Sequence, residues 1–346
     1  MQVAAVILAA GSSSRFGSPK QVVRIAGRTM LERIVAKARL ARLEPILIVA
    51  PTALEVPPGT QRIPNDDPES GISHSLQLGI GAVGSHADAV IVLLADQPTL
   101  PLTAIDAVLS SPTDRPIVAC RDQLGVYAPP VLLRRAAFDV VEATNGDAGL
   151  RSVIEAHPEL VSAIDVARHA PDVDTAADVA ALGEPCPGCG ALLPSHPDGP
   201  THEYLGASPA CWMAFGELAA REFGEVGYGQ LHRHSVDTYA VQHPGDDGRR
   251  QRQSVAVHLI GLCHWLEHGL SAAQLTPITQ RLTADKRDWP RLEPPAWYDM
   301  TLPDLLHATD ADAHARLVRR WAESVWQAWS WHHHQIRTWA EESLGA

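Results

Sequence analysis

The stretch LAAGSSSRFGSPKQ, residues 8–21, places small residues and two cations directly after an apolar run. The overlapping run QVAAVILAA (2–10) is continuously apolar, which predicts a strand buried on both faces. Small residues after such a strand let backbone N–H groups approach a ligand and bind phosphate oxygens. Arg15 and Lys20 add charge of the sign that a triphosphate requires. The stretch therefore predicts an anion-binding loop.

This loop matches neither of two common phosphate-binding patterns. It lacks the glycine–lysine–serine/threonine ending of the P-loop and the three spaced glycines of the dinucleotide fingerprint. On these residues alone, a glycine–serine turn with solvated cations is the alternative interpretation.

Outward from the loop, the first half of the chain alternates segments of strand and helix type. Residues 45–50 and 87–98 contain apolar runs typical of buried strands, whereas residues 29–43 and 71–83 are typical of helices. Repeated strand–helix–strand order predicts an α/β fold over residues 1–182, a doubly wound, mostly parallel, Rossmann-like sheet. Ligands of such sheets bind beyond the carboxyl ends of the strands.

The composition changes near Gly183. All nine tryptophans and most histidines follow it, and the strand–helix alternation stops. Residues 185–346 therefore predict a second, mainly α-helical domain that begins with a small segment rich in glycine and proline.

Composition limits the function classes. The chain has 346 residues, of which 45% are hydrophobic, so each domain can bury a core. A formal charge of −12 argues against nucleic acid as a partner. Five cysteines, an odd number, do not indicate a disulfide framework, and no apolar stretch is long enough for a membrane span. We expect a cytoplasmic protein without a membrane partner.

Five motifs in order resemble the molybdenum cofactor cytidylyltransferase-like (MobA/MocA-like) family of nucleotidyltransferases. The resemblance covers residues 1–182. The motifs are the first loop, GISHSLQLGI (71–80), LLADQP (93–98), NGDAGLR (145–151) and DVDTAADV (172–179).

The resemblance implies a magnesium-dependent transfer. Two anionic reactants must meet, and Mg²⁺ held by carboxylates is the usual means of neutralising them. Asp96 follows a buried strand, and the resemblance implies Asp96 and Asp174 as Mg²⁺ ligands. It also implies that Lys20 and Arg15 hold the β- and γ-phosphates as catalytic cations. A turn or helix-cap role is the alternative for Asp96, because Pro98 follows it closely.

The resemblance also implies the nucleotide site. Guanylyl-transferring relatives usually carry a second glycine where this chain has Ala10, so we expect CTP rather than GTP. The implied nucleotide-binding residues are Leu8, Ala9, Ala10, Gly11, Ser12, Ser13, Gly71 and Ser75.

The resemblance gives an expectation for the acceptor site as well. The resemblance implies Gly146, Asp147 and Arg151 on the acceptor side, with Arg151 as a phosphate clamp. The family often has a glycine–histidine–proline step where this chain has YAPPVLL (127–133). Molybdopterin is the leading acceptor by resemblance, and a sugar phosphate or another phosphate ester remains the alternative.

The second domain opens with CPGCG (186–190), in which two thiols lie two residues apart. With a further cysteine and a histidine this predicts a closed, structural zinc site. His196 competes with His202 for one position, and a redox pair or an unmetallated loop is the alternative. The predicted Zn²⁺ ligands are Cys186, Cys189, His202 and Cys211.

The other histidines of this half, including His234, His243 and His264, are more simply hydrogen-bonded core residues, and a second metal site among them is the alternative. Residues 185–340 resemble a bacterial domain family without an assigned activity, which indicates a unit but not its chemistry.

These observations predict a two-domain enzyme. Its first domain would transfer a nucleotidyl group to a phosphorylated small molecule and release pyrophosphate. The helical domain would position the acceptor or dock a receiving protein, such as a molybdoenzyme or its chaperone. The rival hypothesis is a non-catalytic nucleotide-binding domain fused to a metal-binding interaction or sensor module.

Overall fold

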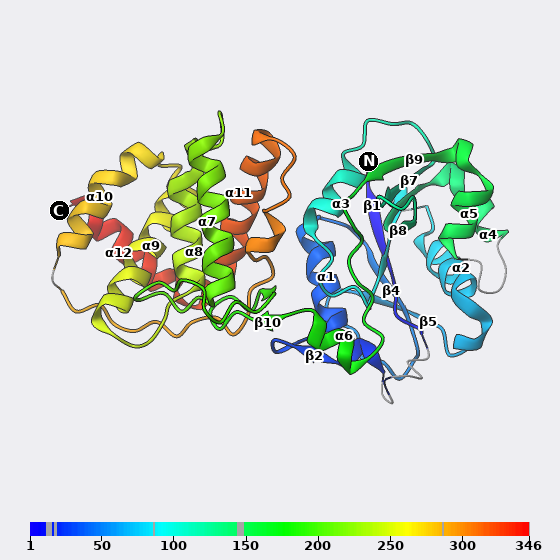
Figure 1. The fold of residues 1–346 in the computed structure, drawn as a ribbon, viewed down its shortest axis with the longest axis horizontal. Coiled ribbons are helices and arrows are strands. Elements are labelled where there is room, and N and C mark those ends of the chain that lie inside the picture. Colours follow the sequence, from blue (N-terminus) through cyan, green and yellow to red (C-terminus); the bar gives the residue numbers. More distant parts are fainter. Residues whose placement is uncertain (12–15, 17–18, 86, 144–148, 286, 346) are drawn as a thin grey trace. The chain divides into compact units, whose positions relative to one another are not determined.

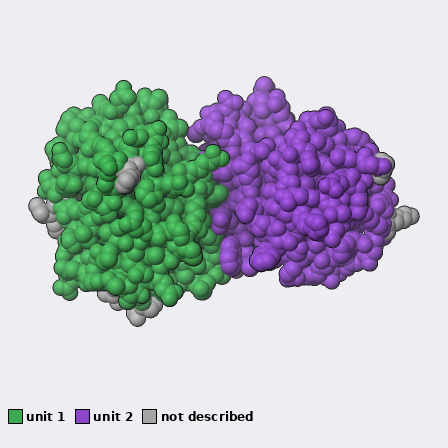
Figure 2. All heavy atoms as spheres, turned by 180° about the vertical axis from the view of Figure 1, so that it is seen from behind, with its two compact units in different colours: residues 1–181 green, residues 182–346 purple. Residues whose placement is uncertain are grey.

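The structure is a computed structural model with two compact units, Met1–Ala181 and Leu182–Ala346 (Figures 1 and 2). Within the described part of the chain, no helix is both long and apolar enough to cross a bilayer. The described residues are 1–11, 16, 19–85, 87–143, 149–285 and 287–345.

Seven strands of the described residues form the main sheet of the first unit, in the order β5-β4-β1-β6-β8-β7-β9. β8 runs antiparallel to both of its neighbours, and the other neighbouring pairs are parallel. The predicted doubly wound, mostly parallel sheet is therefore confirmed. The strands are β1 (Val3–Leu8), β4 (Ile46–Ala50), β5 (Gln61–Pro64), β6 (Ala89–Leu94), β7 (Ile117–Arg121), β8 (Tyr127–Arg134) and β9 (Val161–Asp165).

Helices cover both faces of this sheet (Figure 1). Successive side chains of a strand point to opposite faces, so Ala5 and Ile7 of β1 join one apolar core and Ala4 and Val6 join the other. α1 and α3 supply the first core, and α2, α4 and α5 supply the second. The helices of this unit are α1 (Met30–Leu40), α2 (Gly71–Val83), α3 (Leu102–Leu109), α4 (Phe138–Glu142), α5 (Leu150–Ala156) and α6 (Ala176–Ala181).

The position of β1 determines where a ligand can bind. β1 lies between β4 and β6, so the chain passes to one side of β1 first and to the other side later. Such a reversal leaves a crevice beyond the carboxyl ends of the two strands. The first loop follows β1 and Asp96 follows β6, so both come to this crevice. A small hairpin, β2 (Arg24–Ile25) and β3 (Arg28–Thr29), leads from the loop into α1.

The second unit is mainly helical, as predicted. It opens with a short antiparallel ribbon, β10 (Glu184–Pro185) and β11 (Leu192–Leu193). α9 is the central helix: it packs against α8, α10, α11 and α12, and its Leu259, Ile260 and Leu262 are fully buried. The helices are α7 (Pro209–Gly224), α8 (His232–Gln242), α9 (Arg249–His268), α10 (Ala272–Ala284), α11 (Ala311–Ala328) and α12 (His333–Gly345).

Close packing of α2 against the central strands makes one glycine critical. A Cβ at Gly79 would collide with Cγ1 of Val6 and lie 3.1 Å from Cγ2 of Val49. We expect Gly79→Ala to lower the free energy of unfolding by about 1–3 kcal/mol, because β1 and β4 must shift to admit the methyl group. Urea denaturation followed by far-ultraviolet circular dichroism measures this loss.

Gly81 of the same helix is the matched control, because nothing lies within 4 Å of a Cβ placed there. Gly81→Ala should raise stability by up to about 1 kcal/mol through helix propensity alone. Equal effects of the two substitutions would contradict this packing argument.

Candidate active site and a cysteine–histidine group

Backbone hydrogen bonds hold the end of β1 in the sheet. The Ala9 N–H donates to the Val49 carbonyl at 2.8 Å, and the Ala95 N–H donates to the Leu8 carbonyl at 3.1 Å. Ala9 and Ala10 are buried, whereas Gly11 is exposed and a Cβ there would meet no atom within 4 Å. These bonds hold Ala9, at the start of the quoted stretch, beside the carboxyl ends of β4 and β6. Ser12, Ser13 and Arg15 lie outside the described residues.

Gln21 anchors the far side of the loop. Its side chain is 3% exposed, and its Nε2 donates to the Ala9 carbonyl at 2.8 Å and to the Gly11 carbonyl at 3.4 Å. The bond ties a 3₁₀ turn, Lys20–Val22, back to the end of β1. Sequence reasoning assigned no role to Gln21, although it closes the quoted stretch.

Three of the predicted site residues meet at the crevice. The Lys20 ammonium lies 2.6 Å from Oδ2 of Asp96 and 2.6 Å from Oδ1 of Asp174. The Lys20 side chain is only 13% exposed. Burial lowers the pKa of Lys20, but the hydrogen bonds and charges of Asp174 and Asp96 outweigh burial, so its pKa lies above the usual 10.5. Lys20 is therefore a fixed cation at neutral pH.

Asp174 reaches this cluster because its segment is bonded to the end of β6. The N–H of Val173, which is fully buried, donates to the Asp96 carbonyl at 2.9 Å. The N–H groups of Asp174 and Thr175 donate to one carboxylate oxygen of Asp178, at 3.0 and 2.7 Å. These bonds fix the turn into α6 and hence the direction of Asp174.

Asp172 is a further carboxylate beside the cluster that sequence reasoning missed. It accepts a hydrogen bond from Nε2 of Gln97 at 2.9 Å. Burial, and then the negative charge of Asp96, raises the pKa of Asp172. The signal was present in DVDT, because two aspartates that flank a buried valine in extended chain lie on the same side.

The two residues predicted beside the base lie at the start of α2. Gly71 has a φ of +84°, a conformation that favours glycine. Ser75 is buried, and its hydroxyl accepts a hydrogen bond at 2.9 Å from Nδ2 of Asn65, which directly follows β5. Asn65 was not predicted as part of the site.

Of the predicted acceptor residues, the structure describes Arg151. Gly146 and Asp147 lie outside the described residues. Arg151 is exposed on α5, and its Nε donates to the Tyr127 carbonyl at 3.4 Å.

The crevice fits a hard divalent cation. Oδ1 of Asp96 is buried and has no hydrogen-bond partner within the part of the chain that the structure describes. Oδ2 of Asp96 and Oδ1 of Asp174 converge on one ammonium, so the two carboxylates are close enough to share a cation. Carboxylate oxygens are the ligands that Mg²⁺ and Mn²⁺ prefer.

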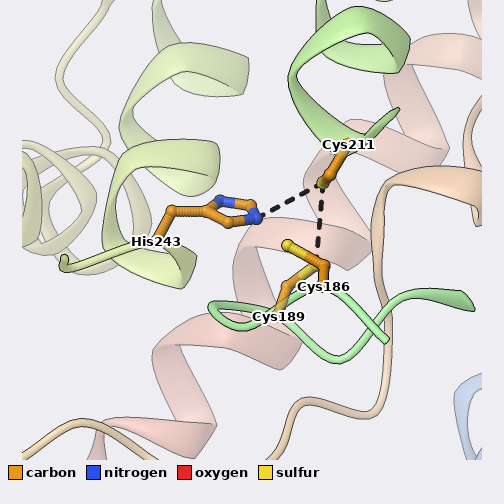
Figure 3. A group of neighbouring side chains, drawn as sticks. All are labelled: Cys186, Cys189, Cys211 and His243. Atoms are coloured by element: carbon orange, nitrogen blue, oxygen red, sulfur yellow. Dashed lines mark hydrogen bonds between the residues drawn. The ribbon is translucent and has the colours of Figure 1, made fainter. Parts of the chain in front are cut away.

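A second group of side chains lies in the helical unit (Figure 3). It consists of Cys186, Cys189, Cys211 and His243, which are buried and whose ligand atoms all lie within 4.8 Å of one another. The histidine that lies in this group is His243, and not the predicted His202. The ring of His202 instead packs edge-on against Tyr204 and Trp212, at centroid distances of 4.4 and 4.8 Å.

Comparison with known proteins matches each unit separately. Residues 5–161 match the family model of the MobA-like NTP transferase domain, and residues 184–330 match DUF5946, a family of unknown function. The purine catabolism protein PucB of Bacillus subtilis (strain 168) is 30% identical over 164 residues, which cover 43% of this chain and 79% of PucB. The resemblance inferred from the five motifs is thereby confirmed.

Solved structures also align with the first half of the chain. Rv0371c from Mycobacterium tuberculosis H37Rv is 26% identical with a TM-score of 0.47, and the alignment covers 52% of this chain and 96% of Rv0371c. Its homologue from Mycobacterium sp. strain JC1 is 28% identical with a TM-score of 0.47, covering 53% of this chain and 96% of the homologue.

Removing the cation of the cluster should destabilise the first unit. Lys20→Met removes the ammonium that lies between the carboxylates of Asp96 and Asp174. Because water screens Asp174, which is 44% exposed, we expect a loss of only about 1–2 kcal/mol at pH 7 without added divalent ions. The raised pKa of Lys20 means that this contribution persists below pH 10.5 and disappears only as the pH rises through the raised value. Denaturant unfolding measures it.

The double variant Lys20→Met/Asp174→Asn is the control. Neutralising Asp174 should recover part of the lost free energy, because the remaining carboxylate no longer faces a like charge. If the losses in free energy of unfolding caused by Lys20→Met and Asp174→Asn simply added, the proposed interaction between the two side chains would be contradicted.

Proposed function

Because residues 5–161 belong to the MobA-like NTP transferase family, we propose that this chain transfers CMP from CTP to the phosphate of a small-molecule acceptor and releases pyrophosphate. The observation that carries the proposal is the convergence of Lys20, Asp96 and Asp174 beyond the carboxyl ends of the central strands. A cation paired with two carboxylates in a ligand crevice suits a substrate that arrives as a metal–triphosphate complex.

Asp96 and Asp174 are the groups that would hold Mg²⁺. When bound, Mg²⁺ supplies positive charge that neutralises the phosphate oxygens and lets the acceptor phosphate approach the α-phosphorus. The Lys20 ammonium would pair with the β- and γ-phosphates and with the departing pyrophosphate. Arg15 is proposed as a second cation for the same oxygens. No nucleophilic side chain is required, because the acceptor supplies the nucleophile.

The proposed preference for CTP depends on the residues that are expected to surround the nucleobase. Ala10 is buried, and its Cβ is proposed to narrow the space available to the base. Gly71 and Ser75, at the start of α2, are proposed to contact the base. Asn65 holds the Ser75 hydroxyl in place, which supports a positioning role for Asn65.

Molybdopterin is the proposed acceptor, with Gly146, Asp147 and Arg151 on its side of the site. A sugar phosphate or another phosphate ester is the alternative, because the YAPPVLL stretch departs from the family pattern. The helical unit is proposed to dock the acceptor or a receiving molybdoenzyme or its chaperone. We place the reaction in the cytoplasm, which agrees with five cysteines that form no disulfide.

A test of this proposal measures pyrophosphate release with CTP or GTP, Mg²⁺ and a panel of phosphorylated acceptors that includes molybdopterin. CTP should be preferred. Asp96→Asn should lower the rate by about 100-fold or more, because a neutral amide would hold less tightly the cation that neutralises the phosphate oxygens. Lys20→Met should have a comparable effect.

Asp88→Asn is the matched control, because Asp88 lies just before β6, at the end of that strand opposite to Asp96. It should leave the rate unchanged. Nucleotide binding without pyrophosphate release for any acceptor would favour the rival hypothesis, a nucleotide-binding domain without catalysis. Tighter binding of GTP than CTP would overturn the assignment of the base.

A further inference from the structure

We infer that Cys186, Cys189, Cys211 and His243 bind one Zn²⁺ ion, and that this ion fastens residues 184–208 to α7 and α8. The inference concerns the second unit and does not depend on nucleotidyl transfer.

The distances within the group match a tetrahedral zinc centre. Sγ of Cys211 lies 3.8 Å from Sγ of Cys189 and 3.4 Å from Nε2 of His243. With Zn–S near 2.3 Å and Zn–N near 2.1 Å, tetrahedral ligands lie about 3.8 Å apart for two sulfurs and about 3.6 Å apart for sulfur and nitrogen. These two separations are close to those that the ion requires, and all four ligand atoms lie within 4.8 Å of one another.

His243 is oriented for metal binding by its own backbone. It directly follows α8, it is fully buried, and its Nδ1 lies 2.7 Å from the Tyr239 carbonyl. A carbonyl only accepts, so Nδ1 carries the proton and Nε2 presents its lone pair. Nε2 points toward the cysteines (Figure 3). Metal-binding histidines are commonly held by a hydrogen bond of this kind.

The two cysteines of CPGCG lie on a tight turn. The Cys186 N–H donates to the Ala191 carbonyl at 2.8 Å, the Gly190 N–H donates to the Cys186 carbonyl at 2.8 Å, and Gly190 has a φ of +72°. Gly188 lets the turn approach His243: a Cβ there would lie 2.5 Å from Cδ2 of the ring. The glycines of the motif thus serve the close approach of all four ligands.

Helix α7 contributes the third sulfur at its first turn. The Cys211 N–H donates to the Ser208 side chain at 3.2 Å, and the Ser208 N–H points at Sγ of Cys186 from 3.3 Å. Backbone N–H donation stabilises thiolate, the form of cysteine that binds metal. The Tyr239 hydroxyl lies 3.6 Å from Sγ of Cys211 and adds a further donor.

The chemistry of the group favours zinc in a structural role. Three soft thiolates and an imidazole select Zn²⁺ over Mg²⁺, which prefers oxygen. All four ligands are at most 3% exposed, so the centre is closed to substrate. A redox role for the Cys186–Cys189 pair is less suitable, because the pair lies on a turn after β10 and not at the start of a helix.

The segment that carries the first two ligands has little core of its own. Between residues 184 and 208, the buried residues apart from the two cysteines are Ala191 and Ala207, and the regular structure is the two-residue pairing of β10 with β11. The helices behind it have an apolar core centred on α9. Zinc therefore supplies the stability that burial supplies elsewhere.

The test is the zinc content of the purified full-length chain after dialysis. We expect about one zinc per chain, and a loss of at least about tenfold in His243→Ala and in Cys189→Ser. His202→Ala and Cys263→Ser are the matched controls and should retain the metal. Asp96→Ala should also retain it, which separates this centre from the crevice of the first unit.

A second measurement uses the unmodified chain. Chelation of the metal should expose Cys186, Cys189 and Cys211 to a thiol reagent and make residues 184–208 sensitive to protease, and added Zn²⁺ or Co²⁺ should reverse both effects. Co²⁺ should also produce the visible absorption of a tetrahedral thiolate complex. A folded chain that contains no zinc and whose thiols do not respond to Zn²⁺ would overturn the inference. So would loss of zinc in His202→Ala but not in His243→Ala.

Discussion

The ion cluster of Lys20 with Asp96 and Asp174 is the interaction on which the first unit's site depends. Two carboxylates that face each other in a crevice repel. The Lys20 ammonium lies 2.6 Å from one oxygen of each carboxylate and offsets that repulsion. The cluster joins segments that are 76 and 154 residues apart in the chain. It therefore holds Lys20, the end of β6 and the turn before α6 together.

The same rule, that a buried charge must have a partner, governs the helical unit. Glu222 is fully buried and accepts hydrogen bonds from Ser235, from His232 at 2.8 Å and from His314 at 2.9 Å. Asp237 is likewise buried, beside Arg233 and His258. These histidines bind carboxylates and hold helices together. Among the described residues, the Cys/His group around His243 differs because its ligand atoms converge on a common point.

The local pattern of apolar residues predicted much of the fold, because buried positions must be apolar. Strands buried on both faces must be continuously apolar, and β1, β4 and β6 are. The loss of strand–helix alternation after Gly183 likewise predicted a helical second half. Contacts between individual polar side chains were not predicted, because they produce no periodic pattern in the sequence. Gln21 and Asn65, for example, act through side-chain hydrogen bonds to residues about ten positions away in the chain.

The sequence by itself determined the sheet class, the family of residues 5–161 and the cysteine pair of CPGCG, because each depends on residue type at short spacing. Only the tertiary structure decided the histidine that accompanies those cysteines. His202 is nearer in sequence, but its ring packs against Trp212, whereas His243 arrives from the end of α8, 32 residues beyond Cys211. Distance along the chain does not limit which side chains meet once helices pack side by side, so spacing could not choose between them.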